Sequence, residues 1–143
     1  MGLVRWRDEY KIDIAEIDRE HQALFDGIAA LVTCLLLQRI KEPDGERRQL
    51  LLDEITLQLK THFRNEETWM KEAGYPEYEQ HRQEHKRLMD EGQRIIREKI
   101  AAGESVSDLL VCLTCWMDEH VVEYDKELGR YAKQRIASYA CPS

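Results

Sequence analysis

The sequence predicts an all-α fold: an up-down-up-down antiparallel four-helix bundle preceded by an N-terminal arm. Apolar residues repeat at intervals of three and four along four long segments, which is the pattern of helices buried along one face. Turn-forming residues separate these segments at Pro43-Asp44-Gly45, at Gly74-Tyr75-Pro76 and at Gly103. The connections are short, and short connections favour antiparallel neighbours.

The N-terminal arm covers residues 1–18, and the first helix follows it. The arm has too many apolar side chains to remain in water, so we expect it to pack along the bundle. These side chains are Trp6, Tyr10, Ile12, Ile14 and Ile17. Asp18 is a residue type that favours the N-cap position, and we predict that it opens the first helix. The buried stripe of that helix is His21, Leu24, Phe25, Ile28, Leu31, Val32 and Leu35.

The next two helices are predicted at about 46–72 and 77–101, and the fourth follows an N-cap at Ser105 or Ser107. The inward stripe of the second helix is Leu52, Ile55, Leu59, His62, Glu66 and Trp69. That of the third is His81, His85, Leu88 and Gly92, continued by Ile95 or Ile96. That of the fourth is Leu109, Leu110, Leu113, Trp116, Met117, His120, Val121 and Leu128. Residues 129–143 form a tail that either extends the last helix or docks on the bundle surface.

Length and charge limit the classes of protein to consider. A chain of 143 residues suffices for one domain, so we take 1–143 as a single domain with its bundle at about 19–128. The net charge of −7, without a basic run, argues against nucleic acid or an anionic membrane as the main partner. We find no apolar signal region and no stretch of about 18 apolar residues, so we expect a cytoplasmic protein.

The four cysteines are Cys34, Cys112, Cys115 and Cys141. We interpret them as small hydrophobic residues within helical apolar patterns. A disulfide or redox switch remains an alternative for the CxxC pair at 112 and 115. A zinc site is disfavoured because the histidines belong to another pattern.

All five histidines fall on the inward stripes, together with two carboxylates at helical spacings. The set is His21, His62, Glu66, His81, His85, His120 and Asp125. Residues at i and i+4 share one helix face, so His62/Glu66 and His81/His85 each present two donors to one small volume. A lone buried histidine is more often a hydrogen-bonded core residue, but five without metal would need five sets of buried partners. We therefore predict a metal centre inside the bundle.

Seven nitrogen and oxygen donors are too many for one tetrahedral ion and suit two ions side by side. The pattern contains no thiolate, which disfavours structural zinc and iron–sulfur clusters. Imidazole mixed with carboxylate suits iron, with manganese, copper or zinc as alternatives. If Glu66 and Asp125 bridge two irons, the five histidines divide into three and two. The iron with two histidines then keeps an open position for a small molecule such as O₂.

The spacing between His120 and Asp125 needs a local distortion. Five residues of ideal helix rotate a side chain by about 140°, so both can reach one centre only if the helix loosens or Asp125 approaches from the flank. We predict a π-type turn within 120–125. The sequence neighbours of the histidines are apolar, which favours reversible O₂ binding over O₂ activation. These neighbours are Leu24, Phe25, Phe63, Trp116, Met117 and Val121. Asp18 and Glu119 are candidate partners that would orient the imidazoles.

The residue pattern resembles the bacterial hemerythrins over residues 5 to about 130. The matching segments are His21, His62-Phe63-Arg64-Asn65-Glu66, His81-Arg82-Gln83-Glu84-His85 and His120-Val121-Val122-Glu123-Tyr124-Asp125. The resemblance implies a four-helix bundle with a non-haem, oxo- or hydroxo-bridged diiron centre that binds O₂ reversibly. It implies that His81, His85 and His120 hold the six-coordinate iron, that His21 and His62 hold the iron that binds O₂, and that Glu66 and Asp125 bridge. Met117 stands where the family commonly has leucine.

Three functions fit the predicted metal centre. The preferred one is a non-enzymatic protein that binds O₂ for storage, delivery or buffering. A diiron oxidase or peroxidase-like enzyme is the second, but the paired Glu-x-x-His motifs of ferritin-like oxidases are missing from this sequence. The third is a sensor of O₂, redox state or nitric oxide, which would need a separate protein partner that the sequence does not identify.

Overall fold

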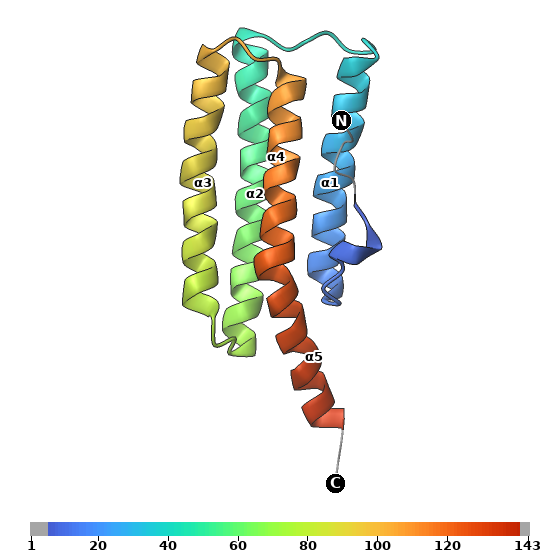
Figure 1. Cartoon of the computed structure of the whole chain (residues 1–143), viewed down its shortest axis with the longest axis vertical. Helices are drawn as coiled ribbons and strands as arrows, with labels where there is room; N and C mark the ends of the chain where they lie inside the picture. Colours follow the sequence, from blue (N-terminus) through green and yellow to red (C-terminus); the bar gives the residue numbers. More distant parts are fainter. Residues whose placement is uncertain (1–5, 141–143) are drawn as a thin grey trace.

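The computed structural model describes residues 6–140, and it describes side chains for residues 6–135. The helices pack side by side along one axis to form a bundle (Figure 1). A short 3₁₀ turn, η1 (Asp8–Tyr10), precedes α1 (Ala15–Leu36), α2 (Gly45–Ala73) and α3 (Tyr78–Ala101). The fourth long helical segment consists of α4 (Val106–His120), the π-helical turn η2 (Val121–Asp125) and α5 (Lys126–Ala140). No strand occurs among residues 6–140. The predicted all-α four-helix bundle is confirmed.

The helix ends follow the predicted turn residues. Gly74 adopts the left-handed conformation that ends α2, with φ 68° and ψ 35°. Behind it the backbone N–H of Tyr75 donates to the carbonyl of Met70 at 2.9 Å, a bond that satisfies one of the last carbonyls of the helix. At the start of α4 the Ser105 hydroxyl accepts from the backbone N–H of Asp108 at 3.2 Å. Of the two serines predicted as N-cap, Ser105 is therefore the cap.

Asp18 does not cap α1, and that prediction is wrong. The helix begins three residues earlier, at Ala15, because Ile14 and Ile17 are both buried by the start of the helix. The Asp18 carboxylate instead accepts hydrogen bonds from the backbone N–H groups of Ile12 (2.9 Å) and Asp13 (3.0 Å). Asp13 has a φ of 64°, so the carboxylate stabilises a sharp turn between the arm and α1.

We expect Asp18→Ala to lower the free energy of unfolding by about 1–3 kcal/mol, because two backbone donors then lose their acceptor. A chain of this size would lose several degrees in Tm, measured by circular dichroism. The control is Asp26→Ala, an exposed residue of the same helix. Equal Tm values for the two variants would show that the carboxylate does not hold this turn.

The apolar core divides into two clusters along the bundle. The larger lies toward the α1–α2 connection and includes Phe25, Val32 and Leu110; the smaller includes Ile17, Met70 and Leu128. The arm packs against the bundle as predicted, since Ile12 and Ile14 are buried in the smaller cluster. The inward polar residues of α1 and α2 lie between the two clusters, so the site described below is enclosed by apolar residues at both ends.

The tail beyond Leu128 extends the last helix. In Figure 1, α5 projects past the α2–α3 connection. Tyr131 attaches it to that connection, because the phenol donates to the carbonyl of Ala73 at 2.8 Å. Gly129 permits the arm to cross close to α5: a Cβ there would overlap the carbonyl oxygen of Ile12. Residues 141–143 lie outside the described part of the chain.

The cysteines differ in their exposure to solvent, although the sequence predicted the same packing role for all of them. Cys34 and Cys112 are half-buried free thiols, which agrees with a packing role. Cys115 is an exposed free thiol, so its interpretation as a core residue is wrong. It lies on the outer face of α4, outside the inward stripe. Cys141 lies outside the described residues.

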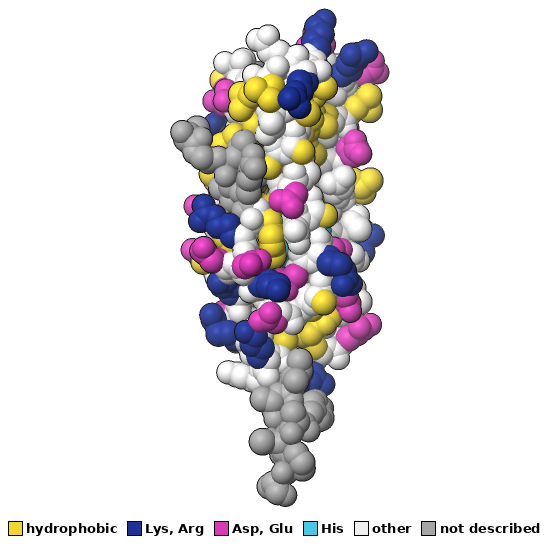
Figure 2. Space-filling model, turned by 90° about the vertical axis from the view of Figure 1, so that its right-hand side faces the viewer, with side chains coloured by type: hydrophobic (Ala, Val, Ile, Leu, Met, Phe, Trp, Pro, Cys, Tyr) yellow, Lys and Arg dark blue, Asp and Glu magenta, His cyan; other side chains and the backbone are white. Residues whose placement is uncertain are grey.

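The surface mixes charges of both signs. Figure 2 views the side of the bundle on which α1 lies, and there Lys and Arg alternate with Asp and Glu. Among the described helices, none combines the length and apolar character needed to cross a bilayer.

Candidate metal centre

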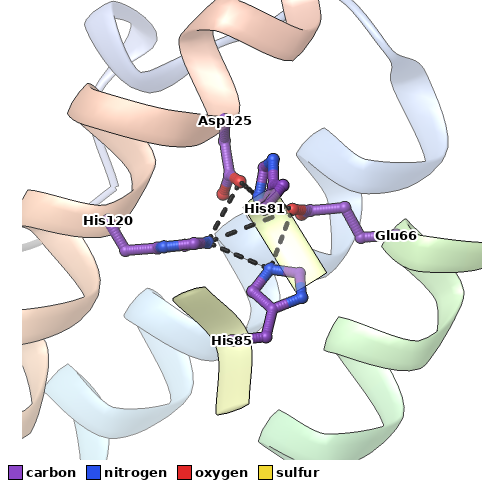
Figure 3. Close-up of side chains that lie close together, drawn as sticks. All are labelled: Glu66, His81, His85, His120 and Asp125. Carbon is purple, nitrogen blue, oxygen red and sulfur yellow. Dashed lines mark hydrogen bonds and ion pairs between the residues drawn. The ribbon is translucent and has the colours of Figure 1, made fainter. Parts of the chain in front are cut away.

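All four long helical segments of the bundle contribute side chains to one cluster in its interior. His21 comes from α1, His62 and Glu66 from α2, and His81 and His85 from α3. His120 is the last residue of α4, and Asp125 is the last residue of η2. The structure therefore brings together every residue of the predicted site. Each is at most 5% exposed. Their donor atoms form two groups: Glu66, His81, His85, His120 and Asp125 make one (Figure 3), and His21, His62, Glu66 and Asp125 make the other.

Glu66 belongs to both groups because its two oxygens face different histidines. Oε1 lies 2.7 Å from Nε2 of His81 and 3.2 Å from Nε2 of His85. Oε2 lies 3.3 Å from Nε2 of His62 and 3.7 Å from Nε2 of His21. The carboxylate is fully buried. If the cluster held two metal ions, each of the two oxygens could bind a different one.

Asp125 has the same divided orientation. Oδ1 lies 3.0 Å from Nε2 of His81 and 3.2 Å from Nε2 of His120. Oδ2 lies 3.0 Å from Nε2 of His21. Each carboxylate thus offers one oxygen to a three-histidine group and the other to a two-histidine group. This is the division that the sequence predicted for two ions.

The hydrogen bonding of these atoms tests whether metal ions fit the cluster. Among the described residues, eight buried side-chain nitrogen and oxygen atoms have no partner with hydrogen-bond geometry, although most of them lie close to another atom of the cluster. All eight belong to His21, His62, Glu66, His81, His120 and Asp125. They include both oxygens of Asp125 and the Nε2 atoms of three histidines. Buried polar atoms without partners are costly, and metal ions inside the cluster would satisfy those that face its centre, so the residues present fit a metal site. The chemistry of the set, imidazole with carboxylate, suits iron.

The turn that presents Asp125 is the predicted π-helix. Residues 121–125 are π-helical, and the backbone N–H of Lys126 donates to the carbonyl of Val121, five residues earlier. This wider turn brings residues five apart close to one face. It explains how His120 and Asp125, both buried, reach the same point from one continuous helical segment.

Two carboxylates outside the cluster hold the far nitrogens of histidines. Glu20 lies 3.3 Å from Nδ1 of His62 and also accepts from Asn65 at 2.7 Å. Glu67 lies 2.9 Å from Nδ1 of His85. Such contacts orient a ligating imidazole and increase its basicity.

The sequence had suggested Asp18 and Glu119 for this role, and both were wrong. Asp18 binds the backbone of the arm, and Glu119 is exposed. The partner of each histidine comes from the helix next to it, where it adjoins a clustered donor in sequence. Glu20, the partner of His62, precedes His21, and Glu67, the partner of His85, follows Glu66. A search for acidic residues adjacent to the stripe of the next helix would have found them.

Aromatic rings fix the planes of His85 and His120. Phe63 stacks on His85 with ring centroids 4.1 Å apart and an interplanar angle of 15°. Tyr124 stacks on His120 at 5.4 Å and 18°. The rings restrict rotation of these imidazoles about their side-chain bonds, so the cluster is organised by packing as well as by polar contacts.

A small apolar cavity of about 30 Å³ adjoins the cluster. Its polar lining comes from His21, His62, His120 and Asp125, and His81 and His85 do not reach it. The six apolar residues that the sequence placed around the site all line it: Leu24, Phe25, Phe63, Trp116, Met117 and Val121. The cavity therefore adjoins both histidines of the two-histidine group but only one histidine, His120, of the other group, and its size suits one small molecule.

Electrostatics couples the carboxylates and imidazoles. Burial opposes charge on His21 and His81, but contact with Asp125 and Glu66 outweighs burial and raises the pKa of each to about 10. Burial is likewise outweighed at His62, whose pKa is raised to about 8 by Glu20 and Glu66. Although burial acts against it, the surrounding imidazoles hold the pKa of the Glu66 carboxyl well below its usual range. The metal-free cluster thus holds protons that metal ions must displace.

We expect Fe(II) binding to tighten as pH rises. At pH 7 the metal-free protein keeps protons on His21 and His81, whose pKa values lie near 10, and largely on His62, whose pKa is about 8. A ligating imidazole must be neutral, so metal binding displaces these protons. Each displaced proton makes the affinity about tenfold higher per pH unit. Anaerobic calorimetry in buffers of different ionisation enthalpy should report about three protons released per chain at pH 7, one from each of these histidines. Binding without proton release, or weaker binding at higher pH, would contradict this electrostatic description.

Comparison with known proteins agrees with this geometry. The family model described as hemerythrin HHE cation binding domain matches residues 13–132. The chain is 30% identical to a bacteriohemerythrin of Stenotrophomonas maltophilia, over 98% of this chain and 88% of the relative. It is 26% identical to bacteriohemerythrins of Clostridium acetobutylicum (85% and 95% covered) and Methylococcus capsulatus (90% and 96%). The matched range contains all seven clustered donors, so the chain belongs to the hemerythrin family, whose domain binds a non-haem diiron centre, and its buried cluster can hold two metal ions.

Proposed function

We propose that this protein binds O₂ reversibly at a non-haem diiron centre and thereby stores, delivers or buffers O₂. The observation that carries the proposal is the position of the apolar cavity. It adjoins both histidines of the group with fewer histidine donors, His21 and His62, whereas only His120 of the other group's three histidines lines it. A ligand in the cavity would meet the metal ion that has a coordination position to spare.

In this proposal each clustered residue has one role. His81, His85 and His120 hold one iron, His21 and His62 hold the other, and the two carboxylates bridge them. The divided oxygen contacts of Glu66 and Asp125 support the bridging role. The contacts of Glu20 and Glu67 keep His62 and His85 in the orientation and tautomer needed for ligation. When bound, the iron pair supplies the two electrons that hold O₂.

The cavity wall favours binding over chemical turnover. Apart from the clustered donors, the residues that line it are apolar or aromatic, with no carboxylate, amine or hydroxyl group among them. A wall of this kind excludes water and offers no general acid or base for further reaction of O₂. This is why we place a binding protein before a diiron oxidase.

The test is an optical titration of the protein after anaerobic loading with Fe(II). We expect a visible band when O₂ is added, and its loss when O₂ is removed under argon, over repeated cycles. Assays for oxidase and peroxidase turnover run on the same samples should stay at background. Irreversible oxidation in the first cycle would contradict reversible binding and favour a redox sensor, and sustained turnover would favour an enzyme.

A further inference from the structure

A second apolar cavity lies between α3 and α4 and does not touch the clustered donors. Its volume is also about 30 Å³. Gly92, Ile95, Ile96 and Lys99 line it from α3, and Leu109, Cys112, Leu113 and Trp116 line it from α4. Ile95, Ile96, Lys99 and Cys112 are only half-buried, so this cavity reaches the surface of the bundle.

The only charged residue in the lining is turned outward. The ammonium group of Lys99 lies 3.3 Å from each carboxylate oxygen of Glu104, beyond the end of α3. The ion pair holds the charged end away from the cavity, and the methylene stem supplies apolar wall. An apolar space that exceeds the volume of one water-sized sphere takes up apolar gases such as xenon more readily than water.

The two cavities share two lining residues, Leu113 and Trp116. The half-buried indole of Trp116 therefore forms a wall between the outer cavity and the cavity at the metal cluster. Movement of this one side chain would join them. The other six residues that line the outer cavity do not line the inner one.

Gly92 determines where that indole lies. A Cβ at Gly92 would overlap Cη2 and Cζ3 of Trp116, so the six-membered ring rests directly on the α3 backbone. Glycine inside a helix costs about 1 kcal/mol relative to alanine. Here it provides the space that the indole occupies, and no larger residue fits without moving the ring.

We propose that the cavity between α3 and α4 is a docking site for a small apolar gas molecule, and that O₂ passes from it to the metal cluster when the Trp116 indole moves. The role in O₂ entry rests on the proposed O₂ binding; the docking site for an apolar gas does not. A passage changes association and dissociation rates by the same factor and leaves the equilibrium constant unchanged.

Xenon is the first probe, because it needs neither iron nor O₂ chemistry. Crystals pressurised with xenon should show an anomalous peak among Gly92, Cys112 and Trp116. Cys112→Phe should abolish this peak by filling the cavity. The matched control is Cys115→Phe, three residues along the same helix but exposed, which should keep the peak. Absence of xenon from the cavity in the unmodified protein would overturn the docking site.

Stopped-flow mixing of the reduced, iron-loaded protein with O₂ tests the passage. We expect Cys112→Phe to slow association and dissociation by a common factor of about ten. Trp116→Leu, which removes the wall, should accelerate association, so the passage is tested even where the phenylalanine variant does not fold. Rates in Cys112→Phe equal to those of Cys115→Phe would overturn the passage. If O₂ oxidises the protein irreversibly, the proposed reversible binding fails. The passage of O₂ past Trp116 is then still tested by comparing the oxidation rates of Cys112→Phe, Cys115→Phe and Trp116→Leu.

Discussion

Glu66→Ala should reduce the iron content from two ions to well below one per chain. Among the carboxylates whose side chains the structure describes, the fully buried Glu66 alone lies within 4.0 Å of a ring nitrogen of all five clustered histidines. Its loss removes an anionic oxygen from both donor groups at once. Asp125 contacts His21, His81 and His120, so it does not replace Glu66 beside His62 or His85. The measurement is iron per chain by mass spectrometry after anaerobic Fe(II) loading and gel filtration.

Two further variants separate ligation from folding. Glu54 lies on the exposed side of the same helix, so the Glu54→Ala variant should retain two irons. Glu66→Gln keeps the shape of the side chain but not its charge, and it should also lose iron. Helical content by circular dichroism must remain near that of the unmodified protein. A folded Glu66→Ala protein that keeps two irons would contradict the bridging role.

Removal of metal should produce the largest change in stability. Metal that binds the folded but not the unfolded chain stabilises by about 4 kcal/mol when its concentration is 1,000 times its Kd. For a chain near 143 residues this corresponds to a Tm difference of about 8–16 °C between loaded and metal-free protein. The physical cause is the cluster of buried donors without hydrogen-bond partners, since metal ions would satisfy the donors that face the centre of the cluster.

The thermal shift needs controls for specificity. Mg²⁺ prefers oxygen ligands and should leave Tm unchanged, because five of the seven donors are imidazoles. The Glu66→Ala variant should show little shift with Fe(II). Equal Tm values for the loaded and metal-free protein would mean that the cluster is satisfied without metal.

The sequence was sufficient to predict the fold and the clustering of the seven residues because both depend on helical periodicity. His62 and Glu66, or His81 and His85, share a face wherever the chain is helical. The same geometry revealed the conflict at His120 and Asp125, whose spacing fits only a widened turn. The π-helix at Val121–Asp125 confirms this expectation.

Features that depend on the relative positions of different helices were not predictable in the same way. Glu20 and Glu67 lie beside histidines of other helices, and no periodicity within one helix reveals such neighbours. The start of α1 was misplaced because the burial of Ile14 and Ile17 outweighs the capping preference of Asp18. The contact of Trp116 with the backbone at Gly92 likewise depends on how closely α3 approaches α4.

The most direct test of the two-metal assignment is anomalous diffraction at the iron absorption edge from crystals of the loaded protein. We predict two iron peaks about 3.5–4 Å apart, as in other two-metal sites, with one oxygen of Glu66 and one of Asp125 directed at each. His81, His85 and His120 should surround one peak, and His21 and His62 the other, which should face the apolar cavity. A single peak, or iron bound outside these seven residues, would contradict the assignment.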